Sequence, residues 1–203
     1  MAQRGRPKGD GHQKQQILDA VIRLTVQQSS STIRMRDVAE AADVSVGMIQ
    51  HHFGSRDNLM DEASRRYLLD VVSKLRSIAA EDAAPWDKLI RLCRRAQSLE
   101  DINDRVVVWI DLLSHATREA SPRESAQAIN TAWTDLLAEV IAEGTSSGEF
   151  RPVGGARTVA EQLVAFVDGL DVAVASGSVG TDSTWRDDQL YSMTRILLGL
   201  PSH

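Results

Sequence analysis

Apolar residues along most of the chain recur at intervals of three and four positions, which is the spacing of helices. No alternating strand pattern persists, and Gly and Pro are scarce inside the periodic segments. Two short helices are predicted near residues 34–52. The pattern predicts longer helices over about residues 13–28, 55–79, 85–99, 102–118, 122–143, 157–176 and 185–198, with a loop over 144–155. We therefore expect an all-α chain of about nine helices.

The first short helix is followed by a turn. Val38, Ala39 and Ala42 have the apolar spacing of a helix, and the next three residues, Asp-Val-Ser, interrupt that spacing. Asp43 tolerates a left-handed turn conformation. Ser45 can accept a hydrogen bond from the free backbone amides of a following helix. The segment therefore predicts a helix, a tight turn and the capped start of a second helix.

The second short helix, over residues 46–52, has an apolar side and a side of small or polar residues. Ile49 and Phe53 lie four positions apart and can face inward. The outward side carries Gly47, Met48, Gln50, His51 and His52. A helix of this kind after a tight turn suits insertion into the major groove of DNA. The two short helices therefore predict a helix-turn-helix.

These residues resemble a known family. The matching pattern consists of Val38-Ala39, Ala42, Val44-Ser45, Gly47, His52-Phe53, Ser55-Arg56 and Leu59. It is similar to the N-terminal domain of the tetracycline-repressor (TetR) family of bacterial regulators, over roughly residues 13–75. We expect a flexible basic arm over 1–12, a three-helix DNA-binding domain over 13–56, and a C-terminal helical bundle over 57–203 for ligand binding and dimerisation.

The sequence departs from the family pattern at two positions. Asp43 stands where the family usually has Gly, and Asp adopts that turn conformation at modest cost. Arg34 stands where a Ser or Thr usually caps the first short helix. The departure at Arg34 leaves the cap to a neighbour such as Thr32.

Charge is unevenly distributed along the chain. The formal net charge is −5, which taken alone argues against a nucleic-acid partner. Residues 1–56, however, hold eight Lys and Arg against five Asp and Glu, whereas residues 57–203 hold 15 against 23. A basic head on an acidic body is expected where one end of a protein meets phosphates.

The candidate DNA contacts lie in three places. The arm carries three cations around Gly and Pro, which suits a narrow minor groove, although it could be only a solubilising tail. Gln50 can pair with an adenine edge, and Met48 or Val46 can touch thymine methyls. The family resemblance implies phosphate contacts by His51 and Arg56. The full candidate set is Arg4, Arg6, Lys8, Arg34, Arg36, Ser45, Val46, Gly47, Met48, Gln50, His51 and Arg56.

His51 and His52 could also be read as a metal pair. Adjacent helical residues point about 100° apart, and no Cys or carboxylate lies four positions away from either histidine. We therefore expect no metal site here. His52 is better explained as a packing or capping residue.

The predicted helix over 157–176 is apolar nearly all round, so it must be covered on more than one side. Together with the last helix it could form a four-helix dimer interface, as in the TetR family, or be buried within one subunit. We favour the dimer, because one short recognition helix reads too few bases alone. The candidate interface residues are Val167, Leu170, Val174, Leu190, Met193 and Leu197.

Aromatic and polar residues on the middle helices are candidates for a ligand pocket. The set consists of Trp109, Asn130, Trp133, Phe166 and Asp168. Aromatic residues with a few polar groups between helices are the usual lining of a small-molecule cavity. Core packing is the competing explanation for each of them. A cationic ligand held by Trp faces and a carboxylate is chemically possible.

The motif inventory argues against an enzyme. The sequence contains no Gly-rich phosphate loop, nucleophile elbow, Cys–His arrangement or metal-ligand spacing. Asp111 and His115 are four positions apart, but with Arg118 they form a polar stripe that we interpret as a solvated face. Three hypotheses remain: a ligand-responsive repressor, a DNA-binding regulator controlled by a partner protein or by nothing, and a helical enzyme.

Composition adds expectations about location. The single Cys93 excludes a disulfide framework within the chain and argues for a reducing cytosol. The sequence has no apolar run of about 18 residues, and its N-terminus is basic and polar. We therefore expect a cytoplasmic protein that is neither secreted nor membrane-spanning and that has no cofactor.

Overall fold

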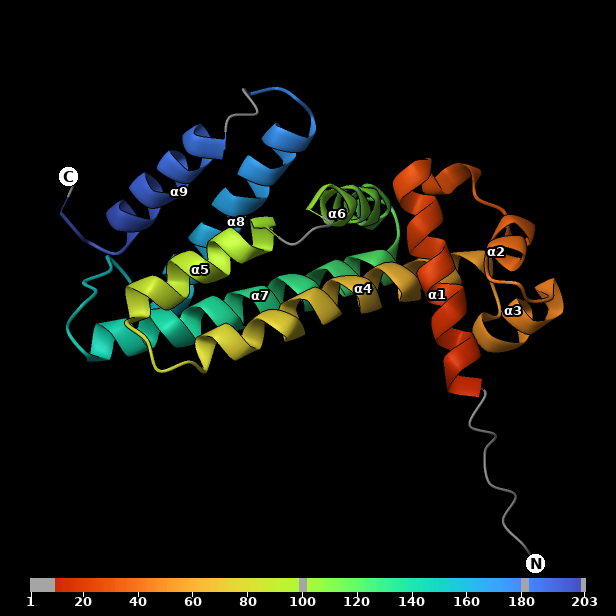
Figure 1. Cartoon of the computed structure of the whole chain (residues 1–203), viewed down its shortest axis with the longest axis horizontal. Helices are drawn as coiled ribbons and strands as arrows, with labels where there is room; N and C mark the ends of the chain where they lie inside the picture. Colours follow the sequence, from red (N-terminus) through yellow and green to blue (C-terminus); the bar gives the residue numbers. More distant parts are fainter. Residues whose placement is uncertain (1–9, 99–101, 180–182, 202–203) are drawn as a thin grey trace, which may run out of the picture. The chain divides into compact units, whose positions relative to one another are not determined.

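The computed structural model describes residues 10–98, 102–179 and 183–201 (Figure 1). The all-α prediction is confirmed, because these residues form helices and turns but no strand. The helices are α1 (Asp10–Gln27), the 3₁₀ turn η1 (Ser30–Thr32), α2 (Met35–Ala41), α3 (Val46–Phe53), α4 (Arg56–Ala79), α5 (Pro85–Ser98), α6 (Ile102–Ala116), α7 (Ala120–Ser146), α8 (Ala156–Ala175) and α9 (Ser183–Leu197).

The chain divides into two compact units. The first is formed by residues 1–67 and 107–125, and the second by residues 68–106 and 126–203. The first unit contains the helix-turn-helix, and helices α4, α6 and α7 contribute residues to both units. The domain boundaries expected from the sequence, after residues 12 and 56, stay a prediction.

The first unit is built on an apolar core shared by α1, α2, α3 and the start of α4. Ile17, Ile49 and Leu59 are fully buried in it. Around them lie Leu18, Ala20, Val21, Ile33, Val38, Ala39, Ala42, Phe53 and Ala63. Each large side chain contributes about 1.5–3 kcal/mol by leaving water, so this core is what holds the short helices α2 and α3 in place.

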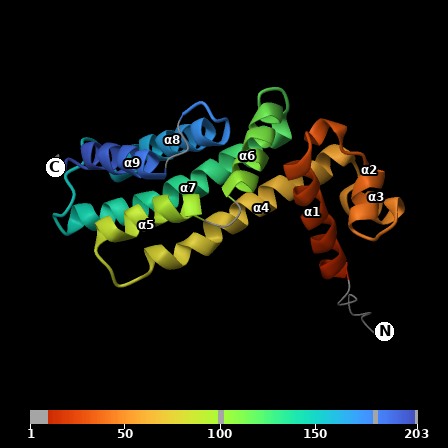
Figure 2. The same cartoon turned by 45° about the horizontal axis from the view of Figure 1, so that its top comes forward.

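In the second unit α8 packs against α9 and α5 against α9 (Figures 1 and 2). Its fully buried side chains include Leu89, Leu92, Leu136, Ile141, Leu163 and Leu190. Lys88 is also buried there, and its ammonium lies 2.8 Å from a carboxylate oxygen of Glu143. Pairing of this kind is what makes burial of a lysine tolerable.

The predicted end of the longest helix is wrong. The sequence places a loop from Gly144, but α7 continues to Ser146. A Cβ added to Gly144 would lie 2.2 Å from a ring carbon of Phe150, and Phe150 is almost fully buried. Gly144 is therefore needed for close packing rather than as a helix terminator, which composition alone does not distinguish.

The solvated stripe predicted on α6 is confirmed only at Arg118, which is exposed. Asp111 and His115 are half-buried, whereas Ile110 and Leu113 are exposed by 40% and 38%. The buried face of α6 in the first unit is formed by Val108, Trp109, Leu112 and Ala116. Apolar residues occur as adjacent pairs along α6, and such pairs do not specify which neighbour faces the core.

No helix in the described ranges combines the length and the apolarity needed to cross a membrane.

Candidate functional site

The turn between α2 and α3 has the predicted geometry. Asp43 has φ of 52°, the left-handed conformation expected for this position. The Val44 N–H donates to the Ala39 carbonyl at 3.0 Å and so satisfies a carbonyl near the end of α2. The Met48 N–H donates to the Ser45 hydroxyl oxygen at 3.1 Å, which confirms Ser45 as the N-cap of α3.

Helix α3 separates an anchoring side from an open side. Ile49 and Phe53 are buried, at 0% and 6% exposure, as the spacing predicts. On the other side Val46, Gly47, Gln50 and His51 are exposed, and Met48 is half-buried. His52 is half-buried, with its ring centroid 6.0 Å from that of Phe53, which fits the packing role expected for it.

The start of α2 is capped differently from the prediction. Thr32 is not the cap, because its hydroxyl donates to the Ser29 carbonyl at 2.8 Å. Instead the backbone N–H of Arg34 donates to Asp37 Oδ2 at 2.7 Å. The guanidinium of Arg34 is not needed for this bond, so it remains available on the exposed surface. Arg36 is also exposed, with its Nε 3.7 Å from Asp37 Oδ1.

Arg56, at the first residue of α4, binds backbone carbonyls of its own unit. Its Nε donates to the Ile33 carbonyl at 2.7 Å, and one terminal nitrogen donates to the Ser30 carbonyl. The other terminal nitrogen lies 3.0 Å from Asp57 Oδ1. The guanidinium therefore ties α4 to the segment that leads into α2. The sequence does not reveal this role, because Ser30 is 26 residues away and carries no motif.

The arm residues Arg4, Arg6 and Lys8 lie outside the described residues. The other predicted DNA contacts are all in the first unit. Ser45, Val46, Gly47, Met48, Gln50 and His51 are brought together on α3. Arg34 and Arg36 stand at the start of α2, and Arg56 is engaged as described.

The second unit contains a pocket of about 310 Å³ of empty space, part of it open to solvent. It is lined by Cys93, Arg105, Trp133, Leu137, Val164, Val167 and Asp168. Burial raises the pKa of the Cys93 thiol to about 12, so Cys93 offers the pocket an apolar sulfur rather than a thiolate.

The structure brings together only part of the predicted pocket set. Trp133 and Asp168 line this pocket, along with Val167 from the predicted interface set. Asn130 is exposed, and neither it nor the half-buried Phe166 belongs to the lining. Trp109 is buried in the first unit, and its indole N–H has no hydrogen-bond partner among the described residues.

A buried charge cluster lies beside the pocket. Asp171 is 4% exposed and accepts from the guanidinium groups of both Arg105 and Arg186. Burial, and next the charge of Arg105, lower the pKa of Arg186 to about 10. Arg105 belongs both to this cluster and to the pocket lining, so a bound molecule would contact a side chain that also holds α8.

The candidate interface residues on α8 and α9 differ in exposure. Val167, Leu170 and Leu190 are buried within the single chain, and Val174, Met193 and Leu197 are half-buried. The exposed large apolar side chains on the same two helices are Val172 at 37%, Trp185 at 37% and Ile196 at 62%. A second subunit that packed against α8 and α9 would cover these three side chains.

Within the described ranges, no group of three or more His, Cys, Asp or Glu side chains is placed to hold a metal ion.

The fold and the open face of α3 define this chain as an all-α helix-turn-helix protein. Residues 17–63 match the family described as bacterial regulatory proteins, tetR family. Residues 85–195 match the family described as BetI-type transcriptional repressor, C-terminal. The second match covers more than half of the chain, so the chain belongs to the TetR family of bacterial transcriptional regulators, with a BetI-type C-terminal region.

Individual relatives agree with this assignment. The chain is 30% identical over 161 residues to the HTH-type transcriptional regulator BetI of Paraburkholderia phymatum, covering 76% of this chain and 77% of that protein. It is 26% identical over 146 residues to the HTH-type transcriptional repressor KstR2 of Rhodococcus jostii, covering 70% of each. The prediction of a TetR-family regulator is confirmed.

Solved structures share the fold. A transcriptional regulator from Saccharomonospora viridis in complex with choline superposes with a TM-score of 0.80. The two are 23% identical, and the superposition covers 90% of this chain and 95% of the other. The reduced form of NemR from E. coli also gives a TM-score of 0.80, at 12% identity over 94% of this chain and 100% of the other.

Replacing Arg56 by Ala tests its anchoring role. We expect the free energy of unfolding to fall by about 1–3 kcal/mol, because two backbone carbonyls lose a charged donor. The matched control is Arg36→Ala, whose side chain is 70% exposed and which should change stability by less than about 0.5 kcal/mol. Both are measured by urea unfolding. An equal free energy of unfolding for the two variants would show that the hydrogen bonds of Arg56 do not stabilise the first unit.

Proposed function

We propose that this protein is a homodimeric repressor that binds a palindromic operator through α3 and releases it when a small molecule occupies the pocket of the second unit. The observation that carries the proposal is the open face of α3. Ile49 and Phe53 on its apolar side are buried in the core, and the side chains left outside are small or polar apart from Val46 and the half-buried Met48. An exposed face of this kind on a capped helix after a tight turn suits base reading in a major groove.

Within α3 the proposed roles follow from chemistry and position. Gln50 is exposed and can donate to and accept from an adenine edge, and Met48 and Val46 offer apolar contacts to thymine methyls. Gly47 has no atom but the Ser45 hydroxyl within 4 Å of an added Cβ, so it leaves room for a close approach of DNA. Ser45 and His51 stand where phosphate contacts are expected.

Phosphate contacts outside α3 are assigned to Arg34, Arg36 and the arm cations Arg4, Arg6 and Lys8. The exposure of Arg34 and Arg36 supports this assignment. The family resemblance also places Arg56 at a phosphate. Its guanidinium already binds the carbonyls of Ile33 and Ser30, so its contribution to DNA affinity is proposed to come chiefly through the placement of α2.

The dimer is proposed to form through α8 and α9. Val172, Trp185 and Ile196 supply exposed apolar surface on these two helices, and Val174, Met193 and Leu197 add partly exposed surface. Pairing with a second copy would bury these side chains in a four-helix interface. The two α3 helices would then read half-sites about one DNA turn, roughly 34–36 Å, apart.

The effector is proposed to bind in the pocket that Trp133, Arg105 and Asp168 line. Trp133 offers an aromatic face and Asp168 a carboxylate, which suits a small cationic molecule such as choline better than a long acyl chain. Choline is bound in the Saccharomonospora viridis structure, and stearoyl-CoA in that of FadR from Bacillus subtilis. These neighbours support a small-molecule effector for the fold.

Release from DNA requires a difference in affinity. A molecule that bound the free and the DNA-bound protein equally well would not shift the equilibrium between them. The proposed effector must therefore bind the free protein more tightly, and operator DNA must weaken effector binding by the same factor.

Gln50→Ala tests base reading. We expect affinity for the selected operator to fall by about 1–3 kcal/mol, with relaxed preference at one base position of each half-site, because one bidentate contact is lost. The measurements are operator selection from a random pool and titration by fluorescence anisotropy. Gln28→Ala, at an exposed glutamine outside α3, serves as the control. An unchanged operator consensus and affinity for Gln50→Ala would contradict the role.

Ile196→Glu tests the dimer. We expect size-exclusion chromatography with light scattering to give twice the chain mass of 22.3 kDa for the unaltered protein and about half that value for the variant. The control is Val153→Glu, because Val153 is 88% exposed and lies outside α8 and α9. A protein that stays monomeric at micromolar concentration while binding DNA specifically would contradict the dimer.

Trp133→Ala tests the effector pocket. Choline and stearoyl-CoA are the first probes, each added to the preformed protein–operator complex in an anisotropy titration. We expect that choline-sized molecules which release the unaltered protein from the operator will not release Trp133→Ala. The variant should still bind operator DNA. Phe166→Ala, outside the pocket lining, should respond like the unaltered protein. An effector that acts equally on Trp133→Ala would place effector binding elsewhere.

A further inference from the structure

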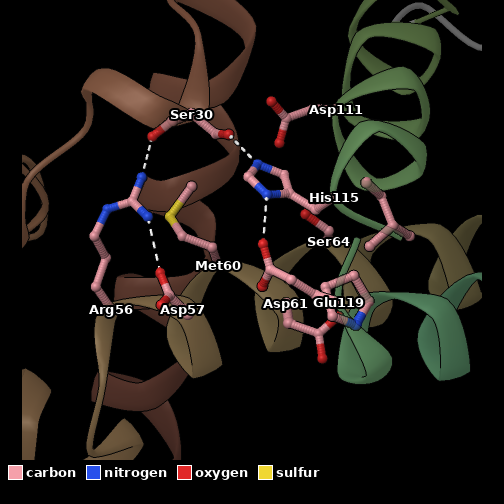
Figure 3. Close-up of a pocket in the computed structure, with 11 residues that line it drawn as sticks. Ser30, Arg56, Asp57, Met60, Asp61, Ser64, Asp111, His115 and Glu119 are labelled. Atoms are coloured by element: carbon pink, nitrogen blue, oxygen red, sulfur yellow. Dashed lines mark hydrogen bonds and ion pairs between the residues drawn. The ribbon is translucent and has the colours of Figure 1, made fainter. Parts of the chain in front are cut away.

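We propose that the first unit carries a second binding site, for an organic cation with several N–H donors. The site is a pocket formed by the η1 segment, α4, α6 and the start of α7, with about 360 Å³ of empty space that is partly open to solvent (Figure 3). Its lining consists of Ser30, Arg56, Asp57, Met60, Asp61, Ser64, Asp111, Leu112, His115, Glu119 and Pro122. All these residues belong to the first unit.

Negative charge predominates in this pocket. Four carboxylates line it, against the single guanidinium of Arg56. Arg56 is engaged by two backbone carbonyls and by Asp57, and Glu119 Oε1 lies 3.3 Å from His115 Nδ1. These pairings account for Asp57 and Glu119. They leave the charges of Asp61 and Asp111 without a cation from the described residues.

The acceptors of these two carboxylates are incompletely used. Asp61 Oδ2 accepts from the Ser121 hydroxyl at 2.6 Å, but Asp61 Oδ1 is buried and has no hydrogen-bond partner in the described part of the chain. No hydrogen bond or ion pair from a described residue reaches the Asp111 carboxylate. In Figure 3 this carboxylate lies on the α6 side of the pocket.

Ser64 is an independent indication of a ligand. It lines the pocket and is only 4% exposed, yet its hydroxyl has no hydrogen-bond partner among the described residues. Buried polar side chains are normally satisfied, so an unused hydroxyl in the wall of a pocket points to a group that enters from outside. The same pocket thus presents one hydroxyl and two carboxylates with unused acceptor capacity.

This combination selects the ligand class. An ammonium group supplies three N–H donors and a guanidinium five, and either brings the positive charge that two carboxylates require. Met60, Leu112 and Pro122 add apolar wall, which suits an alkyl chain attached to the charged group. A metal ion does not fit, because no three described His, Cys, Asp or Glu side chains are placed to coordinate one. An alkyl diamine satisfies all three requirements.

The pocket borders the contacts that position the helix-turn-helix. The carbonyl of Ser30 accepts from Arg56, and the Ser30 hydroxyl lies 3.2 Å from His115 Nε2. A cation bound here would therefore lie beside the segment that leads into α2, in the first unit. It would be separate from the Trp133 pocket, whose lining belongs entirely to the second unit.

Isothermal titration of the full chain with 1,4-diaminobutane at constant ionic strength tests the proposal. We expect saturable binding of one diamine per chain, at least ten-fold weaker in Asp61→Asn and in Asp111→Asn. Tetramethylammonium, which has charge but no N–H donor, should not saturate the site. Glu124→Gln removes an exposed carboxylate outside the pocket, and Trp133→Ala alters the second unit; both should bind like the unaltered protein.

Thermal unfolding of each variant confirms that it is folded before titration. Three results would overturn the proposal. The first is the absence of saturable diamine binding, which would mean that water alone fills the pocket. The second is an equal loss in Glu124→Gln and in the pocket variants, which would indicate general charge attraction. The third is loss of binding in Trp133→Ala alone, which would place the diamine in the second unit.

Discussion

An isolated helix of eight residues has no stability of its own in water, so α3 depends on the apolar contacts that hold it. Ile49 and Phe53 supply those contacts, and the Ser45 hydroxyl satisfies one of the amides that the helix start would otherwise leave free. Because these three residues stabilise the helix, the side chains on its outer face are not needed for folding. Their identities can therefore be selected for DNA recognition, which is the role proposed for them.

The features that could be predicted from the sequence are those set by neighbours along the chain. Asp43 in a left-handed turn and the Ser45 cap depend on residues within four positions, and the structure has both. The features that could not be predicted depend on long-range packing. Arg56 occupies a position of the family motif, but the two backbone carbonyls that it binds are 23 and 26 residues away. Glycine is typical of a helix end, but Gly144 lies inside α7 and leaves the space that the Phe150 ring fills.

The same distinction applies to the pockets. Trp133 and Asp168 could be predicted from the sequence because aromatic side chains with a few polar groups between helices are the usual lining of a small-molecule cavity. Arg105 was not, because it is 66 residues from Asp171 and lies on a helix with several other charges. Its burial is stabilised by Asp171, and two guanidiniums share that one carboxylate. Removing Asp171 would take a charged partner from both guanidiniums, so moving α8 away from Arg105 is costly.

This constraint bears on how the proposed effector could alter DNA binding. Helices α4, α6 and α7 each contribute residues to both units, so a change in the second unit can reach the first along continuous backbone. Arg56 is the first residue of α4 and holds the carbonyls of Ser30 and Ile33, just before α2. A displacement of α4 would therefore act on the segment that positions the helix-turn-helix. The proposed effector needs to bind the free protein more tightly than the DNA-bound protein by only about 1–3 kcal/mol, which is the usual range of allosteric coupling energies.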